Sequence, residues 1–205
     1  MRRIPVVLVL ILAACVWPLA SGVAYSSSTT YAAAAGSLQA DFNHDGFADL
    51  AVGAPFEDVG TIPDGGAVNV LYGSAGKLAG VGSQLFTQDS PGVGSSAEPG
   101  DAFGFTLAAG DFNHDGFADL AIGVPGEDVG GIVDGGAVNV LYGSAGGLTG
   151  VGSQLFTQDS PGVGSSAEPG DLFGEALAAS GPQSATASPA SPASRSGERR
   201  PAPRR

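Results

Sequence analysis

Asp41-Phe42-Asn43-His44-Asp45-Gly46-Phe47-Ala48-Asp49 occurs twice in this chain, and its second copy runs from Asp111 to Asp119 without a change. Each copy places oxygen-bearing side chains at positions 1, 3, 5 and 9 of a loop, and position 7 offers a backbone carbonyl. Hard oxygen donors at alternate positions, with a glycine turn at position 6, suit a calcium ion. The expected ligands are Asp41, Asn43, Asp45, Phe47 and Asp49 in one loop and Asp111, Asn113, Asp115, Phe117 and Asp119 in the other.

The loop differs from the helix-flanked calcium loop of an EF-hand. Position 12 holds Val52 or Ile122 where an EF-hand has a bidentate glutamate, and apolar residues typical of a strand follow it. The alternative interpretation is a turn rich in Asp and Asn that binds no metal. Position 4 holds His44 or His114, which we expect to face solvent.

The loops belong to a longer tandem repeat. Residues 41–110 align with residues 111–180 with 11 differences in 70 positions. Each copy predicts four short strands separated by turns rich in Gly, Ser and Pro. In the first copy the predicted strands are Leu50–Val52, Ala67–Tyr72, Gln84–Gln88 and Phe103–Ala109. No stretch after the N-terminal segment has helical periodicity, so we expect an all-β fold built from repeated sheets.

The spacing of Phe103-Gly104, the loop from Asp111 to Asp119 and Gly123-Val124-Pro125 resembles the FG-GAP repeat of integrin α-subunit β-propellers and of secreted bacterial integrin-like proteins. Gly53-Ala54-Pro55 gives the literal motif in the first copy, and Phe173-Gly174 opens a third. The resemblance covers about residues 36 to 180. It implies one propeller blade per repeat and structural Ca²⁺ in the loops, with ligands bound by other loops. That family uses seven blades, so about two FG-GAP blades would form an incomplete propeller.

Charge and composition argue against several classes of function. Residues 25–180 carry 19 acidic side chains and one basic side chain, Lys77, a balance that opposes binding to nucleic acid or anionic lipid. The only histidines lie inside the two loops, and nothing completes a nucleophile–base pair or a zinc site. We therefore expect a calcium-binding adhesion or recognition module with an extracellular protein or glycan ligand, not an enzyme. The alternatives are the non-catalytic propeller portion of a secreted phospholipase-like hydrolase and a truncated gene product without current function.

The N-terminus predicts export. Arg2 and Arg3 precede the apolar run from Ile4 to Leu19, and Gly22-Val23-Ala24 provides a signal-peptidase site. Residues 1–24 are the expected signal peptide, and residues 25–40 are the expected linker and start of the first blade. A lipid anchor through Cys15 is the alternative. With the signal peptide removed, the chain should be secreted, without insertion in the membrane.

The C-terminal residues break the repeat. Residues 41–110 and 111–180 are the two predicted repeats, but Gly181 stands where the next loop would begin, and five Arg residues follow from Arg195 onward. The Ala-Thr-Ala-Ser-Pro stretch from Ala185 to Pro189 is what one GC-rich coding sequence for Gly-Asp-Gly-Phe-Ala would give when read one base later. Residues 181–205 are therefore interpreted as a disordered or frameshifted tail. Self-association that completes a propeller is also left open.

Overall fold

The computed structural model describes residues 40–179, and every regular element in that range is a β-strand. This confirms the all-β class. Within these residues there is no helix with the length and hydropathy required to cross a membrane. The expected signal peptide, the lipid-anchor alternative, most of the linker and the expected tail lie outside the described residues.

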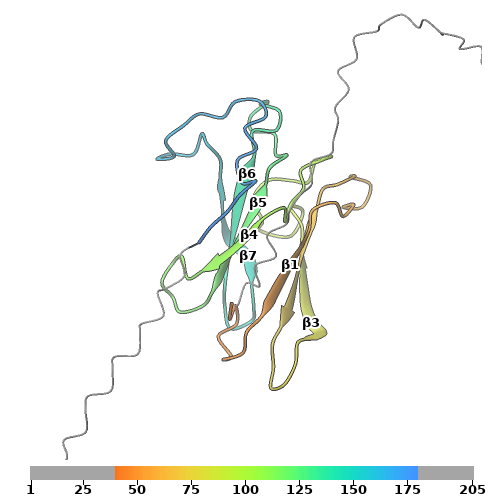
Figure 1. Cartoon of the computed structure of the whole chain (residues 1–205), viewed down its shortest axis with the longest axis vertical. Coiled ribbons are helices and arrows are strands. Elements are labelled where there is room, and N and C mark those ends of the chain that lie inside the picture. The colour runs from red at the N-terminus through yellow and green to blue at the C-terminus, as the bar shows by residue number, and fades with distance from the viewer. Residues whose placement is uncertain (1–39, 180–205) are drawn as a thin grey trace, which may run out of the picture. The chain divides into compact units, whose positions relative to one another are not determined.

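The strands form two antiparallel sheets (Figure 1). The first sheet, blade 1, contains β1 (Leu50–Ala54), β2 (Ala67–Tyr72) and β3 (Ala79–Phe86). The second, blade 2, contains β4 (Leu107–Gly110), β5 (Asp119–Val124), β6 (Ala137–Tyr142) and β7 (Thr149–Phe156). Strands adjacent in the chain are adjacent in each sheet, which is the up-and-down order of a propeller blade. The architecture is that of incomplete propeller blades.

The alternating sequence of β2 explains its burial. Val68 and Val70 point into the core and are fully buried, whereas Asn69 between them is exposed. β1 pairs with β2 from Leu50 opposite Leu71 to Ala54 opposite Ala67, and β5 pairs with β6 in the same register. The prediction of a strand over residues 67–72 is confirmed, and the strand predicted at 50–52 extends to residue 54.

Two predicted strands have different bounds. β3 begins at Ala79 and ends at Phe86, so the prediction that it spans residues 84–88 is wrong. Gly80 and Gly82 weaken the strand pattern of its first half, and a register shift between Val70 and Tyr72 lets the hairpin continue through them.

The fourth strand, predicted over residues 103–109, begins only at residue 107 as β4. Ahead of it, Phe103 makes an isolated parallel bridge with Gly66 of blade 1. A methyl group built at Gly53 would overlap the carbonyl oxygen of Gly104, and one built at Gly104 would lie 2.8 Å from the carbonyl oxygen of Ala67. At the Phe103-Gly104 pair the chain therefore passes close to the backbone of blade 1, and glycine is needed at residues 53 and 104 because a side chain would overlap the other backbone.

The sheets and the sequence repeats have different boundaries. β4 lies before the second acidic loop, so the inner strand of blade 2 comes from the end of the first repeat. In blade 1 the corresponding contact within the described residues is the bridge between Ala40 and Asp49. It matches the pairing of Gly110 with Asp119 in blade 2.

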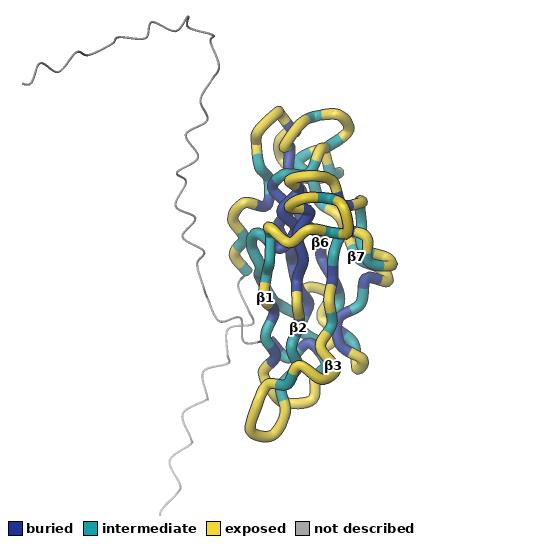
Figure 2. Tube along the Cα trace, turned by 90° about the vertical axis from the view of Figure 1, so that its right-hand side faces the viewer, coloured by how far each residue is buried: buried dark blue, intermediate teal, exposed yellow. Residues whose placement is uncertain are grey.

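Blade 2 has a buried layer on both faces. One core cluster joins Val68 and Val70 of blade 1 to Leu120, Ile122 and Val124 of blade 2. A second cluster covers the other face of blade 2, where the last residues of the second repeat contribute their apolar side chains, Phe173, Leu177 and Ala179. Because Phe173-Gly174 opens a third FG-GAP motif, we call this segment the start of the third repeat. Every residue of β5 is therefore buried. In the nearly identical β1, which Figure 2 labels, only Ala51 is buried and Val52 on the opposite face is exposed.

Polar contacts lock the same interface. The Tyr72 hydroxyl accepts a hydrogen bond from the Leu148 N–H at 2.9 Å and donates to the side-chain oxygen of Gln84. The Gln84 amide nitrogen donates to the Leu148 carbonyl at 3.0 Å, and the Ser153 hydroxyl donates to the Gly92 carbonyl at 2.5 Å. Three of these four bonds join residues from the two repeats, so they fix how blade 2 sits on blade 1.

Candidate metal centre

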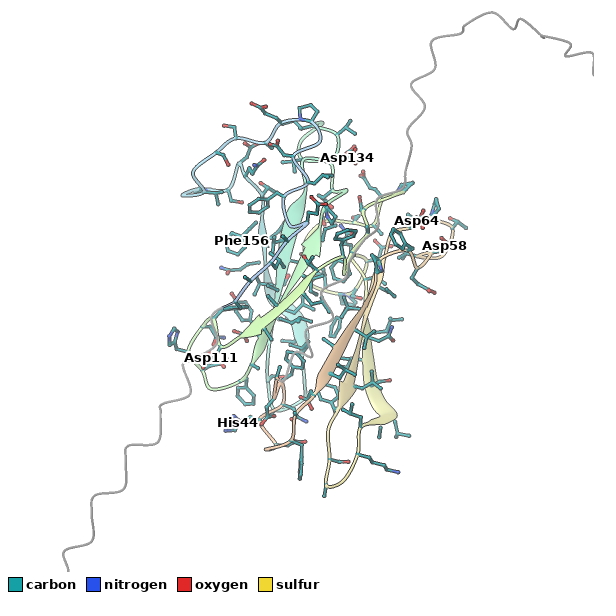
Figure 3. The ribbon with its side chains drawn as sticks, in the orientation of Figure 1. His44, Asp58, Asp64, Asp111, Asp134 and Phe156 are labelled. Carbon is teal, nitrogen blue, oxygen red and sulfur yellow. The ribbon has the colours of Figure 1, made fainter. Side chains whose placement is uncertain are left out.

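The two acidic loops, residues 41–49 and 111–119, lie at the same end of the sheets. The second loop joins β4 to β5, and the first leads from the Ala40 bridge into β1. Figure 3 shows His44 and Asp111 at this end, whereas Asp58, Asp64 and Asp134 lie at the opposite end. The structure thus gives the two loops equivalent places in successive blades.

Inside the first loop, side-chain oxygens bind the loop's own backbone. The Asp41 carboxylate accepts the N–H groups of Asp45 at 3.0 Å and Gly46 at 2.9 Å. Asn43 accepts the same Asp45 N–H at 3.2 Å, and Asp45 accepts the N–H of Phe47 at 2.9 Å. The Asn43 amide also donates to the Asp45 carboxylate at 3.1 Å. The side chains at positions 1, 3 and 5 are thereby drawn together around one turn.

The second loop repeats this arrangement bond for bond. Asp111 accepts the N–H groups of Asp115 and Gly116, both at 3.1 Å, and Asn113 accepts that of Asp115 at 2.9 Å. Asp115 accepts the N–H of Phe117 at 2.9 Å and the Asn113 amide at 2.8 Å. Because identical sequences reach the same geometry in two different surroundings, the loop conformation is a local property.

The aspartate at position 9 of each loop is more deeply buried than the other acidic residues of the same loop. Asp49 is 3% exposed, and its two oxygens accept the N–H groups of Phe42 and Gly73, both at 2.8 Å. Asp119 accepts the equivalent pair at 2.8 and 2.9 Å. This residue therefore ties the start of the loop to the end of the neighbouring strand, a role that the sequence prediction, which gave it only a metal, did not include.

The pKa of the aspartate at position 9 is raised in both loops. Burial raises the pKa of Asp49, the N–H groups of Gly73 and Phe42 lower it, and the charges of Asp41 and Asp45 raise it again. Burial likewise raises the pKa of Asp119. Asp41, Asp45 and Asp49 thus lie near enough to repel one another, and a bound cation would relieve that repulsion.

The donor set fits a hard cation in its chemistry. Each loop gathers carboxylate and amide oxygens and excludes sulfur and imidazole ligands, which is the preference of Ca²⁺. Over residues 40–179, no three His, Cys, Asp or Glu side chains form a ready metal-holding group. The carboxylate oxygens of the loops instead accept the loop's own N–H groups, as in the Asx-turn alternative. Binding of Ca²⁺ would exchange some of these hydrogen bonds for metal contacts.

The histidines at position 4 adopt left-handed backbone conformations. His44 has φ of 56° and His114 has φ of 63°, and Gly46 and Gly116 follow with φ of 88° and 93°. Both histidines are exposed, as expected. His44 also packs edge-on against the Phe117 ring of the second loop, with the ring centroids 5.6 Å apart. This contact between the loops was not predicted from the sequence.

Phe42 is the second feature that the sequence prediction missed. It is fully buried in the core cluster between the blades, and its carbonyl accepts the Ser144 N–H at 3.2 Å. The Asp41 carbonyl accepts the Ala118 N–H at the same distance. An apolar ring at position 2 of an otherwise acidic loop was the available signal. The first loop is therefore attached to blade 2 as well as to blade 1.

Comparison with known proteins agrees with this architecture. The family model described as FG-GAP repeat matches residues 33–71 and 103–141. Phosphatidylinositol-glycan-specific phospholipase D of Rattus norvegicus is 40% identical over 106 residues, which are 51% of this chain and 12% of that protein. Integrin alpha-3 of Cricetulus griseus is 35% identical over 125 residues, 60% of this chain and 11% of the integrin. Integrin alpha-PS5 of Drosophila melanogaster is 41% identical over 116 residues, 54% of this chain and 10% of the integrin.

The chain therefore spans only 10% to 12% of the length of these three relatives. Within that span, the matched residues include both acidic loops and the first two strands that follow each of them. The protein thus contains two FG-GAP repeats, forms a propeller-type module and is a homologue of integrin α subunits.

Proposed function

We propose that the protein is an exported, non-catalytic propeller module in which each acidic loop holds one structural Ca²⁺, and that it serves extracellular adhesion or recognition. The observation that carries the calcium assignment is the convergence of carboxylate and amide oxygens in both loops with the same set of hydrogen bonds. Asp41, Asn43, Asp45 and Asp49, with the Phe47 carbonyl, would hold the first ion. The equivalent residues Asp111, Asn113, Asp115, Asp119 and Phe117 would hold the second.

The calcium would brace the loops. In each loop it would neutralise three carboxylates that repel one another, and so stabilise the turn that precedes β1 or β5. The first loop also contacts blade 2 through Phe42 and His44, so its order affects the packing between blades. Sites of this kind in extracellular modules bind Ca²⁺ with Kd of roughly 10⁻⁴ to 10⁻³ M, and we expect affinities in that range.

Calorimetric titration of Ca²⁺ into the full chain tests the assignment. Wild type should bind two ions, and the Asp45→Ala, Asp115→Ala double variant should bind neither. Asp45→Asn with Asp115→Asn is the sharper pair of changes, because Asn keeps an oxygen for the Phe47 or Phe117 N–H and so preserves an Asx turn. A turn without a metal would tolerate Asn, whereas a calcium site loses a charged ligand.

The matched control for charge is Glu57→Gln with Glu168→Gln. Both glutamates are exposed and lie outside the acidic loops, so this variant removes the same two charges and should keep both sites. Wild type that takes up no Ca²⁺ at millimolar concentration would exclude the calcium assignment. Equal weakening by the control pair would show that binding reflects general negative charge.

Export and adhesion have separate tests. Mass spectrometry of protein from the culture medium should show a new N-terminus after Ala24, and lipidation at Cys15 would favour the anchored alternative. Immobilised protein should capture an extracellular protein or glycan partner, and calcium chelation should weaken the capture.

The second candidate function is the propeller portion of a secreted hydrolase. The relatives named phosphatidylinositol-glycan-specific phospholipase D favour it, because they are 40% and 39% identical to this chain over 106 residues. A coding sequence for a hydrolase domain in one frame with these repeats at the locus would support this candidate. Sequencing of the locus also tests the frameshift hypothesis, which fails if no FG-GAP repeat follows in the shifted frame, and a closed frame with neither would favour a truncated product.

A further inference from the structure

The contact between the blades is made by two surfaces. We call the side of a blade that receives the next blade its trailing surface; in blade 1 it comprises Tyr72, Gln84 and residues 88–101. We call the opposite side of a blade its leading surface; in blade 2 it comprises residues 126–127 and 147–153. Backbones approach closely here, since a methyl group built at Gly150 would lie 2.5 Å from the Pro91 carbonyl oxygen.

The trailing surface of blade 2 is a copy of that of blade 1. Residues 150–171 have the same sequence as residues 80–101. Their backbone bonds also agree, because Val163 and Val93 each bond the serine three residues earlier at 3.0 Å. Tyr142 donates to Gln154 as Tyr72 does to Gln84. A surface of the same sequence, with several of the same hydrogen bonds, is thus available to a further blade in a chain whose described residues hold no third sheet. We call this surface the socket.

The leading surface of blade 1 differs from that of blade 2 where the contact is tightest. A methyl group built at Gly126 would overlap the carbonyl oxygen of Gly100 across the interface. The equivalent residue in blade 1 is Phe56, which is 59% exposed. The turns match, with the Glu57 N–H bonding Ala54 at 3.1 Å and the Glu127 N–H bonding Val124 at 3.3 Å. A phenylalanine in this place would collide with the backbone of a preceding blade.

A second replacement lies in the turn before the last strand. Gly147 has φ of 96°, and a methyl group there would overlap the Tyr72 hydroxyl. Its equivalent in blade 1 is Lys77, whose turn places the positive φ of 101° one residue earlier, at Gly76. Leu148, after Gly147, is 3% exposed and bonds Tyr72, whereas Leu78 after Lys77 is 42% exposed. Blade 1 therefore lacks both features that blade 2 uses for docking here, the turn with its positive φ at the second glycine and the buried leucine that follows it.

We propose that the trailing surface of blade 2 binds an FG-GAP blade with glycine at the positions of Gly126 and Gly147, and that Phe56 and Lys77 prevent a second copy of this chain from occupying it. Two nearly identical blades would otherwise make a head-to-tail contact that repeats from copy to copy and ends only where a ring closes. The socket would then select its partner because Phe56 and Lys77 clash when a second copy of this chain approaches. The inference does not rest on the calcium assignment, because the four residues that decide it, Phe56, Lys77, Gly126 and Gly147, lie outside the acidic loops.

Sedimentation velocity on the full chain over a range of concentrations tests the proposal. Wild type should be monomeric, and the Phe56→Gly, Lys77→Gly variant should associate head to tail. We expect at least about a tenfold rise in the association constant, which corresponds to about 1.4 kcal/mol. Fluorescently labelled wild type should bind the unlabelled double variant, because wild type keeps the socket, and should not bind unlabelled wild type.

Gly80→Val added to the double variant provides the control. Gly80 is exposed with open space around a built methyl group, so folding should tolerate valine, but its equivalent Gly150 lies against Pro91 when a blade docks. The triple variant should return to monomer. Three results would overturn the proposal: wild type that associates as strongly as the double variant, a folded double variant that stays monomeric, or a triple variant that associates undiminished. Circular dichroism confirms that each variant is folded.

Discussion

Glu127 should make the protein less stable as pH rises, and Glu127→Gln should remove most of that loss. The Glu127 carboxylate accepts a hydrogen bond from the Gln88 amide across the blade interface at 2.6 Å. Gln88 and Asp101 beside it are each 1% exposed. Lys77 is the only basic residue among residues 40–179, so this range offers almost no positive charge that could pair with the carboxylates of Glu127 and Asp101.

The magnitude follows from the pKa of Glu127. Burial raises that pKa from 4.5 to about 7, with the Asp101 and Glu98 charges adding to the rise and hydrogen bonds from Gln88 and Ser95 opposing it. Between these two values the folded protein binds more protons than the unfolded chain, so stability is full below about pH 4.5 and is lost as pH rises through about 7. At about 1.4 kcal/mol per pKa unit, this rise corresponds to about 3.5 kcal/mol. Glu127 is only half-buried, so solvent screening reduces the expected loss to on the order of 2 to 3 kcal/mol.

Asp101 acts in the same direction over a lower range. Burial raises its pKa to about 6, the Glu98 N–H and Gln88 oppose the rise, and the Glu98 and Asp128 charges add to it. A variant that retains Asp101 should therefore keep a smaller loss of stability, centred below that of Glu127. Glutamine at position 127 keeps an oxygen that accepts the Gln88 amide, so the hydrogen bond survives while the charge is removed.

Urea unfolding of the full chain at several pH values between about 5 and 8 measures the effect. The free energy of unfolding of wild type should fall across this range, and that of Glu127→Gln should fall less, with the largest gap at the alkaline end. Glu57→Gln is the matched control, because Glu57 is the equivalent residue of blade 1 and is exposed. An equally steep fall in Glu127→Gln, or the same flattening in Glu57→Gln, would refute the reasoning.

Three further predictions are each measured by urea unfolding of the full chain. Tyr72→Phe should cost about 1 kcal/mol because it removes the acceptor of the Leu148 N–H of blade 2, and Tyr142→Phe on the outer blade should cost less. Gly123→Ala should cost about 1 to 3 kcal/mol because its methyl group would overlap the third repeat's backbone, whereas Gly164→Ala, in open space, should be nearly neutral. Asp119→Ala should cost about 3 kcal/mol because it leaves two N–H groups unpaired, and no loss would contradict its bracing role.

Local pattern was enough to predict some elements from the sequence. The alternation from Ala67 to Tyr72 gave β2 with its observed bounds, since strand burial follows a period of two. β3 was placed five residues late because Gly80 and Gly82 carry no side chain from which a pattern can be read. The acidic loops were predicted from spacing, and the structure brings positions 1, 3 and 5 together as that spacing requires. Whether they hold Ca²⁺ stays a prediction.

Burial could not be predicted in the same way, because the repeat presents one sequence to two environments. Asn69 and Asn139 occupy the same place in identical strands, yet Asn69 is exposed and Asn139 is fully buried. Phe42 is likewise buried between the blades, whereas its equivalent Phe112 is exposed. Neighbouring blades make these differences, and no sequence window of one repeat contains that information.

The same comparison shows where stability resides in such a chain. β5 is buried on both faces because blade 1 covers one and the start of the third repeat covers the other, while β1 keeps an exposed face. In repeat proteins the free energy of folding is approximately a sum of terms for single repeats and for contacts between neighbours. The face of blade 2 that packs on blade 1 therefore shows the environment that this face would have in each blade of a longer array. Each added blade with glycine at the two close contacts should contribute one more interface of this kind, so stability should increase with the number of such blades.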